Sequence, residues 1–364
     1  MKKLFYYFYS FLFKIYRLFG VRENRISLVS PHNAYFTDSL KFVEDEFSKR
    51  GNYQFNRVSS NDLKSISGAL KFFTKSAYKI ATSKFIFLND NFMPFSYVSF
   101  SDKTKVIQLW HGQGVFKKFG LDSQLTDNER LLANKCAEKY DYIAVSSENV
   151  AKFYMSAFNA TSEKIIVSGI PESDYYYLSE SKQNIFRGKY NIPKEKKIVL
   201  YAPTFRDSIE DNKGILEKFS IEKFNDEFSG EYQLVVRLHP QVHEETGLKN
   251  VIDATEYDNV NEIISDADIL ITDYSSICME FAMLKKPMLF FAYDLEKYKN
   301  DRNFYFDYEE YVPGKVVKSF DELVEAINNN DYKNEKIKKF NEFNFSYDDG
   351  KSTQRIVDCL LKNK

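Results

Sequence analysis

The sequence has few of the residues that cross-link a protein. Its three cysteines, Cys136, Cys278 and Cys359, lie far apart and include no C-x-x-C pair. An odd number of scattered cysteines argues against a disulfide framework and against a cysteine-rich zinc site, and it indicates a reducing compartment.

The sequence also lacks the common signatures of nucleic-acid and nucleotide binding. The net charge is −1, so the composition gives no reason to expect a nucleic-acid partner. Neither G-x-G-x-x-G nor G-x-x-x-x-G-K-[ST] occurs, which leaves no dinucleotide fingerprint and no Walker A loop. No short-period repeat or low-complexity linker interrupts the 364 residues, and this length allows two domains with separate cores.

The first twenty residues contain no acid but have a strongly apolar character. Lys14 and Arg17 interrupt the apolar run before it reaches the roughly 20 residues that a membrane-spanning helix needs. No small-residue cleavage site of a signal peptide follows. We expect residues 1–22 to form an amphipathic helix that lies on the membrane, with its aromatic residues inward and Lys and Arg toward anionic lipid. The alternative is a helix that packs on the protein's own core.

Short apolar runs then alternate with helical patterns, which predicts an α/β fold. The runs in the first half are 26–30, 85–89, 106–110, 142–146 and 165–170, and those in the second half are 198–202, 234–239, 251–254, 269–272, 288–293 and 316–317. Near-continuous apolar strands are typical of parallel sheets covered on both faces. We expect two doubly wound domains, 23–180 and 181–364, that face a cleft holding the site.

The segment 269–284 predicts a strand, a hydroxyl-bearing turn and a helix that begins near Ser276. Backbone N–H groups at a helix start, together with the hydroxyls of Ser275 and Ser276, suit a phosphate. The alternative is that one of these serines only caps the helix.

Other candidate phosphate ligands follow two further strands. Thr204 and Arg206 come after 198–202, and Arg237 and His239 alternate along the strand after it, so that both point the same way. Together with Ser275 and Ser276 they would form one anion pocket. For Arg206 the alternative is a surface ion pair with Asp207 or Glu210.

The chain has only four histidines, and His111 lies in Trp-His-Gly-Gln-Gly directly after a strand, with Lys117 and Lys118 close behind. Its glycines allow the backbone to approach a ligand. For any one histidine the alternative is a structural, hydrogen-bonded role. We predict no metal site: Pro240 opposes a helix that would pair His239 with His243, and Asp266-Ala-Asp268 precedes its strand, away from the expected ligand edge.

Five stretches in order resemble the CDP-glycerol glycerophosphotransferase family, the teichoic-acid primases and polymerases. They are 108–120, 201–206, 237–240, 272–281 and 304–314, within a resemblance that spans 105–317. Three positions depart from the family's usual pattern: Gln113-Gly114 replaces Thr-Pro, and Glu172 replaces Arg.

The resemblance implies a GT-B-like fold, a CDP-activated polyol phosphate donor and peripheral attachment to the cytoplasmic face of the bacterial membrane. It implies an acceptor-side first domain and a CDP-donor-binding second domain. The expected catalytic residues are His111, as the base, and His239, which also belongs to the donor phosphate site. The expected donor-site residues are Thr204, Arg206, Arg237, Asp273, Ser275, Ser276 and Glu280, and those on the acceptor side are Gly112, Gln113 and Lys117.

The expected reaction is transfer of a polyol phosphate, foremost glycerol phosphate from CDP-glycerol, to a hydroxyl of a lipid-linked glycan or polyol-phosphate chain, with release of CMP. We expect no tightly bound cofactor, and the sequence leaves a divalent-metal requirement open. Two alternatives are a GT-B glycosyltransferase that uses a nucleotide sugar in cell-surface polysaccharide synthesis and a non-catalytic membrane module that binds an anionic polymer. Glycerol and ribitol are not distinguished, nor are primase and polymerase, or wall teichoic acid and capsule.

Overall fold

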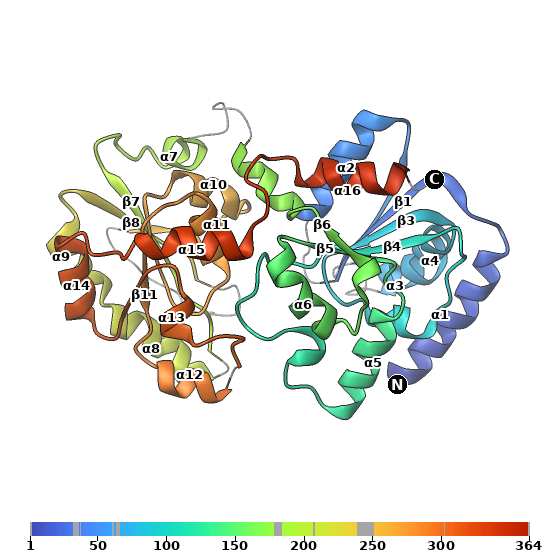
Figure 1. The fold of residues 1–364 in the computed structure, drawn as a ribbon, viewed down its shortest axis with the longest axis horizontal. Coiled ribbons are helices and arrows are strands. Elements are labelled where there is room, and N and C mark those ends of the chain that lie inside the picture. The colour runs from blue at the N-terminus through green and yellow to red at the C-terminus, as the bar shows by residue number, and fades with distance from the viewer. Residues whose placement is uncertain are drawn as a thin grey trace. The chain divides into compact units, whose positions relative to one another are not determined.

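The computed structural model describes residues 2–31, 36, 38–59, 62, 66–177, 184–206, 208–238, 251–301 and 303–362 (Figure 1). The chain divides into two compact units. Unit 1 comprises Met1–Tyr175 together with Asn344–Lys364, and unit 2 is Tyr176–Phe343. The predicted second domain, 181–364, differs from unit 2 mainly at its end, because residues 344–364 belong to unit 1.

Unit 1 is built on a parallel six-stranded sheet in the order β2-β1-β3-β4-β5-β6. Its strands are β1 (Arg22–Ser30), β2 (Gln54–Ser59), β3 (Ser83–Leu88), β4 (Lys105–Gln108), β5 (Tyr142–Val145) and β6 (Ile165–Val167). Five of these lie on the predicted apolar runs. The sequence analysis missed β2, an edge strand in which Phe55 and Val58 are the only apolar residues, so that it has no continuous apolar run.

Helices cover both faces of this sheet. On one face, α2 (Ser39–Arg50) and α16 (Ser352–Lys362) share a buried core with the strands, in which Phe47 and Ile356 take part. The remaining helices of unit 1 are α1 (Lys2–Arg17), α3 (Ile66–Lys71), α4 (Ala77–Ala81), α5 (Asp127–Ala137) and α6 (Glu148–Ala157). Short helical segments are η2 (Phe72–Ser76), η3 (Met93–Tyr97), η4 (Gly120–Asp122), η5 (Ser162–Lys164) and η6 (Pro171–Tyr177).

A carboxylate holds α16 in unit 1. The backbone N–H groups of Ser352 and Thr353 donate to the two carboxylate oxygens of Asp174, each at 2.8 Å. Gly169 lies against the same helix start with φ +80°, and a Cβ placed on it would come within 2.3 Å of Ser352 Oγ. The position therefore requires glycine both for its backbone angle and for its close contact.

The N-terminal helix α1 has one buried and one exposed apolar face. Tyr9 and Phe13 are buried, and the Ser10 hydroxyl donates to the Tyr97 carbonyl. On the other side Leu4, Phe11 and Leu18 are 74%, 60% and 85% exposed. The helix thus packs on its own unit, as the alternative interpretation held, and still presents apolar side chains to solvent. Among the described residues, no helix combines the length and apolarity required to cross a bilayer.

Unit 2 has a second parallel six-stranded sheet, in the order β12-β11-β10-β7-β8-β9. The strands are β7 (Lys197–Ala202), β8 (Tyr232–Val236), β9 (Ile252–Asp253), β10 (Ile269–Thr272), β11 (Met288–Phe291) and β12 (Lys315–Val317), each on a predicted run. The strand order reverses between β7 and β10, so the loops after these two strands flank the point where such sheets bind ligands.

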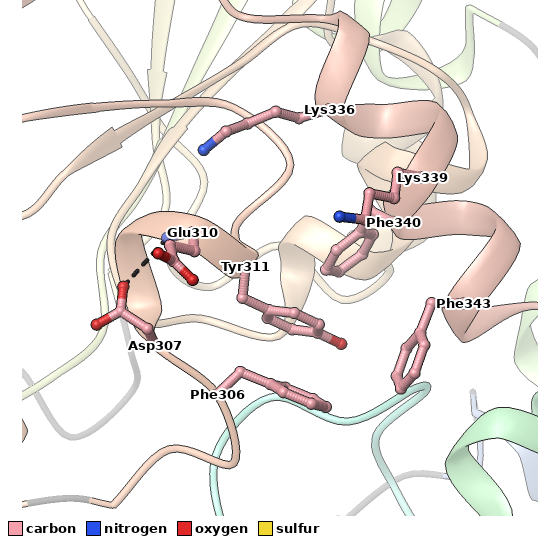
Figure 2. Close-up of a pocket in the computed structure, with 8 residues that line it drawn as sticks. All are labelled: Phe306, Asp307, Glu310, Tyr311, Lys336, Lys339, Phe340 and Phe343. Atoms are coloured by element: carbon pink, nitrogen blue, oxygen red, sulfur yellow. Dashed lines mark hydrogen bonds between the residues drawn. The ribbon is translucent and has the colours of Figure 1, made fainter.

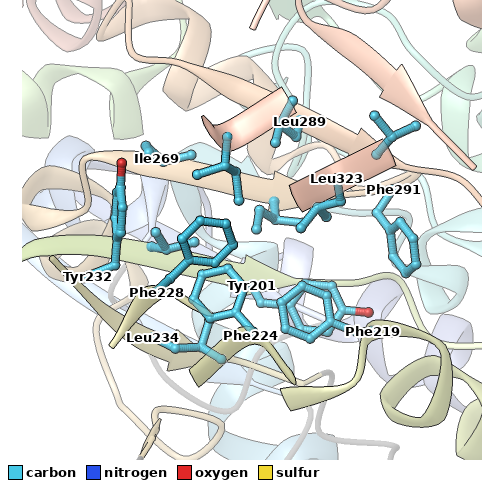
Figure 3. Close-up of a cluster of buried hydrophobic side chains, with 14 of the residues drawn as sticks. Tyr201, Phe219, Phe224, Phe228, Tyr232, Leu234, Ile269, Leu289, Phe291 and Leu323 are labelled. Carbon is cyan, nitrogen blue, oxygen red and sulfur yellow. The ribbon is translucent and has the colours of Figure 1, made fainter. Parts of the chain in front are cut away.

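The helices of unit 2 are α7 (Ile185–Lys189), α8 (Ile209–Phe219), α9 (Ile221–Phe228), α10 (Val260–Asp266), α11 (Ile277–Met283), α12 (Leu295–Asp301), α13 (Tyr308–Tyr311), α14 (Phe320–Asn328) and α15 (Glu335–Asn344). Side chains of α8, α9 and α14 bury one face of the sheet, where the Tyr201 and Phe219 rings stack with centroids 3.8 Å apart (Figure 3). This aromatic core fixes the strands whose ends carry the predicted donor site.

Candidate active site

His111 follows β4 on a turn that the backbone of Trp110 creates. Trp110 has φ +59°, an uncommon conformation for a large residue, and its N–H donates to the Gln108 side-chain oxygen at 2.9 Å. The Trp110 ring is buried and packs on the His111 ring, with centroids 4.2 Å apart. As a result the His111 side chain is held against a fixed surface and remains 38% exposed.

The hydrogen bond of the His111 ring determines its tautomer. Nδ1 lies 3.1 Å from the Asn89 carbonyl oxygen, which can only accept, so Nδ1 carries the proton. In the neutral ring the lone pair is then on Nε2. Asp90 Oδ2 lies 3.8 Å from the same Nδ1 and would stabilise the ring when it is protonated. The sequence analysis missed Asp90, although it directly follows the predicted strand 85–89.

The predicted acceptor-side residues lie on the loop that follows His111. Tyr154 donates its hydroxyl proton to the carbonyls of Gly112 and Gly114, at 2.9 and 3.2 Å, which holds the loop in place. Gln113 is buried and Lys117 is half-buried. A Cβ on Gly112 would contact only the Trp110 ring, at 3.8 Å, so an alanine fits there. Within Trp110–Gly114, only the His111 side chain is exposed.

In unit 2, Asp273 joins the loops after β7 and β10. Its Oδ1 accepts from the Thr204 N–H at 2.7 Å, and its backbone carbonyl accepts from the Tyr308 hydroxyl at 2.9 Å. The Thr204 hydroxyl is buried and has no hydrogen-bond partner among the described residues. The structure thus brings Thr204 and Asp273 together and leaves a hydroxyl at their junction.

Arg206, predicted to grip a phosphate, has its guanidinium occupied by protein groups. Its Nη2 donates to Asp273 at 2.9 Å, its Nε donates to Asp294 at 2.7 Å, and its Nη1 donates to the Thr204 carbonyl. The side chain is only 6% exposed. Burial opposes its charge, but the two carboxylates outweigh burial and raise the pKa of Arg206. In this arrangement Arg206 positions the loops of the site.

Arg237 is likewise engaged inside the unit. Its Nη1 donates to the Ala254 and Tyr257 carbonyls, at 2.7 and 2.8 Å, which ties β8 to the segment after β9. Burial lowers the pKa of Arg237. His239, the other predicted ligand on this strand, lies outside the described residues, as do His32 and His243.

The two serines before α11 differ in what they contact. Ser275 Oγ accepts from the Ile277 N–H at 3.4 Å, which agrees with the capping alternative, whereas Ser276 makes no side-chain cap and is exposed. The N–H of Met279 is also occupied, by the Ser276 carbonyl at 2.9 Å. Glu280 is half-buried one turn further along. An anion at this turn would therefore meet the Ser276 hydroxyl rather than the N–H groups of the first helical turn.

Asp266 and Asp268 serve the local structure. Asp266 accepts from the Asn184 and Arg187 N–H groups, at 2.7 and 2.9 Å, at the start of α7. Asp268 accepts from the Ile198 N–H at 2.7 Å, at the start of β7. Among the described residues, no group of His, Cys, Asp or Glu has the arrangement of a metal site.

Comparison with known proteins finds relatives that match most of this chain. The Teichoic acid poly(ribitol-phosphate) polymerase of Bacillus spizizenii is 32% identical over 97% of this chain and 58% of its own length. This chain thus spans somewhat more than half of that relative. The Teichoic acid glycerol-phosphate primase of Bacillus subtilis is 34% identical over 79% of this chain and 75% of its own.

The fold agrees with that of a solved relative. A structure of the wall teichoic acid polymerase TagF matches with a TM-score of 0.83 at 24% identity, covering 98% of this chain and 94% of that chain. The two parallel six-stranded sheets are therefore those of a TagF-like, GT-B-type fold. Residues 11–362 also match the family described as CDP-Glycerol:Poly(glycerophosphate) glycerophosphotransferase. On both grounds, the chain belongs to the CDP-glycerol:poly(glycerophosphate) glycerophosphotransferase family.

Proposed function

We propose that the protein transfers a polyol phosphate, foremost glycerol phosphate, from a CDP-linked donor to a hydroxyl of a membrane-linked acceptor, with release of CMP. The product would be a teichoic-acid or capsule-type polymer. Family membership supports this reaction class, and relatives are named for both glycerol phosphate and ribitol phosphate. The observation that carries the proposal is His111, an exposed imidazole whose Nδ1 proton is committed to the Asn89 carbonyl.

In the proposed reaction His111 acts as general base. The acceptor oxygen attacks the donor phosphorus that bears the polyol, and its proton passes to Nε2 of His111. The bond between that phosphorus and the bridging oxygen breaks, and CMP leaves with the electron pair. The imidazolium formed keeps its Nδ1–H bond to Asn89, and the Asp90 carboxylate, at 3.8 Å, stabilises the positive charge.

On the donor side we propose that hydroxyl groups hold the diphosphate. The Ser276 hydroxyl is exposed, and that of Thr204 has no partner among the described residues. Both are donors suited to phosphate oxygens. Arg206 holds the two loops that carry them, through Asp273 and Asp294, and so acts by positioning. His239 remains in the proposal as a donor-site residue.

A donor panel tests the reaction. Purified protein with an acceptor of the polyol-phosphate type is offered CDP-glycerol, CDP-ribitol and several nucleotide sugars, and CMP release and product mass are measured. We expect CDP-glycerol to be consumed with addition of glycerol phosphate. Preferential use of CDP-ribitol would change the polyol and keep the mechanism, whereas consumption of a nucleotide sugar would favour the glycosyltransferase alternative.

We also propose peripheral attachment to the cytoplasmic face of the bacterial membrane through the exposed face of α1. Leu4 and Phe11 belong to its apolar part, and Leu18, directly after the helix, continues it. Lys14 is exposed beside them, and the half-buried Arg17 donates to the Ser99 carbonyl at 2.9 Å. Apolar side chains flanked by basic ones suit an interface with anionic lipid.

A further inference from the structure

Unit 2 contains a pocket of about 300 Å³ that is lined by none of the residues assigned to the donor site (Figure 2). It lies between α13, with the two residues that precede it, and α15. All of its lining belongs to unit 2. Its volume is at the lower end of small-molecule pockets, which favours a ligand the size of a single ring.

Aromatic rings make up the apolar wall of this pocket. Phe306 and Tyr311 stack with centroids 4.4 Å apart, and Phe343 meets Phe306 edge-on at 5.5 Å. Tyr311 also contacts Phe340, at 5.0 Å. Phe340 is buried, but Phe306, Tyr311 and Phe343 stay partly exposed at the pocket. Such rings offer flat apolar surface that the C–H groups of a ligand can cover.

Two acids and two lysines surround the rings. Asp307 accepts from the Glu310 N–H at 3.2 Å, as Figure 2 shows, and Lys336 donates to the Glu309 carbonyl at 2.8 Å. The carboxylate of Glu310 and the ammonium of Lys339 have no hydrogen-bond partner among the described residues, and both side chains are exposed. The pocket therefore offers both acceptors and donors of hydrogen bonds to a ligand.

The charges select the class of ligand. A polyanion, such as a polyol-phosphate chain, would meet the carboxylates of Asp307 and Glu310 as well as the lysines, and like charges repel. A neutral ring that carries hydroxyl groups satisfies the whole lining: it donates to the carboxylates, accepts from Lys339, and lays its C–H face on the aromatic rings.

We propose that this pocket binds a pyranose ring, and that this ring is the sugar of the acceptor. The second part rests on the proposed function, which supplies a membrane-linked acceptor. The first part does not, since binding of a sugar can be measured with no donor present.

Saturation-transfer NMR on the full chain tests the binding. The probes are methyl β-D-glucopyranoside and methyl N-acetyl-β-D-glucosaminide, with glycerol 3-phosphate as an acyclic anion. The variants are Glu310→Gln and Lys339→Met, whose side chains are exposed; Lys338→Met is the matched control, because Lys338 is 85% exposed on the same helix and does not line the pocket.

We expect at least one pyranoside to bind, and each pocket variant to bind it about tenfold more weakly, the scale of one charged hydrogen bond. Lys338→Met should bind as the unchanged protein does. The proposal is overturned if neither pyranoside binds, if the pocket variants bind as tightly as the control, or if glycerol 3-phosphate binds more tightly than the sugars. It is also overturned if the protein forms a dimer that Lys339→Met dissociates, which would assign the pocket to a second copy.

Transfer kinetics separate this inference from the proposed function. With a sugar-bearing acceptor, Glu310→Gln and Lys339→Met should raise the acceptor KM about tenfold and leave the KM for the CDP donor unchanged. Normal acceptor KM values in both variants would refute the acceptor role. If the unchanged protein transfers nothing from any CDP donor while pyranosides still bind, the proposed function fails and the sugar site stands.

Discussion

Among single residues, His111 shows how its neighbours fix the chemistry of an imidazole. The Asn89 carbonyl accepts a hydrogen bond from Nδ1–H. The Gln108 side chain links the neighbours of His111, because it accepts from the Trp110 N–H and donates to the Asp90 carbonyl at 3.3 Å. A base whose tautomer is preset needs no rearrangement before it accepts a proton.

Replacing His111 by alanine is expected to lower turnover by about 10²-fold or more, because the attacking hydroxyl loses its proton acceptor. Asp90→Asn should cost about tenfold, since the ring keeps its Asn89 bond and loses only a nearby charge. Steady-state CMP release gives both values. The KM for the CDP donor should stay constant in each variant, and near-normal turnover in His111→Ala would remove this residue from the base role.

Substitutions at the two serines of the β10–α11 turn are expected to have different effects, one on donor binding and the other on stability. Ser276→Ala removes an exposed hydroxyl and should raise the KM of the CDP donor by about fivefold to tenfold. Ser275→Ala removes a capping acceptor and should lower the free energy of unfolding by about 0.5–1 kcal/mol. Kinetics and urea denaturation of both variants check the assignment. An unchanged donor KM in Ser276→Ala would contradict the phosphate site.

At the scale of secondary-structure elements, three loops meet at Arg206. These loops follow β7, β10 and β11, and they carry Thr204, Asp273 and Asp294, respectively. The guanidinium also lies 5.1 Å from the centroid of the Tyr274 ring. Such a buried ion network defines one arrangement of the loops, because breaking it leaves the buried carboxylates without a cationic partner.

Arg206→Ala is expected to lower the free energy of unfolding by about 3–5 kcal/mol, since Asp273 and Asp294 lose their shared cation. Urea denaturation measures the change. The double variant with Asp294→Asn should recover part of the loss, because one uncompensated charge disappears. If Arg206→Ala instead kept its stability and only weakened donor binding, Arg206 would be the phosphate clamp that the sequence predicted.

The docking of α16 can be tested at Gly169. Gly169→Ala should lower the free energy of unfolding by about 1–3 kcal/mol, because φ is +80° and the added Cβ would clash with Ser352. Gly188→Ala is the control: among the described residues no atom lies within 4 Å of a Cβ placed there, and alanine favours the helix α7. Equal stability of the two variants in urea would show that α16 tolerates displacement at this point.

Elements with a continuous local pattern could be predicted from the sequence, and long-range partners could not. The apolar runs predicted eleven strands, but β2 at the edge of its sheet has only two apolar residues, Phe55 and Val58, which Asn56 and Arg57 separate. The charge of Arg206 was visible, whereas its partner Asp294 lies 88 positions away. Likewise, the tautomer of His111 depends on Asn89, 22 positions earlier, which no local pattern relates to it.

On the scale of the whole molecule, the exposed face of α1 is the surface that we propose to contact the membrane. Tyr9 and Phe13 belong to the core of unit 1, so removing the helix would uncover that core as well as the apolar surface. Substitution of exposed side chains alone is therefore the sharper experiment. The amphipathic pattern was visible in the sequence, but which apolar residues face inward depends on packing against unit 1.

The triple variant Leu4→Ser, Phe11→Ser and Leu18→Ser is expected to bind vesicles of phosphatidylglycerol and phosphatidylcholine at least about 10²-fold more weakly, because three apolar side chains leave the interface. Sedimentation with vesicles measures the partition. Leu131→Ser, at another exposed leucine, is the matched control and should bind normally. Undiminished binding of the triple variant would assign membrane contact to another surface.

The return of residues 344–364 to unit 1 has a consequence for biosynthesis. Unit 2 is one uninterrupted stretch, 176–343, whereas unit 1 needs segments from both sides of it. The ribosome therefore synthesises all of unit 2 before α16. Until α16 has been made, the face of the unit 1 sheet that α16 shares with α2 is only partly covered. Unit 1 can therefore complete its fold only after α16 has been synthesised, whereas every residue of unit 2 has been synthesised before that point.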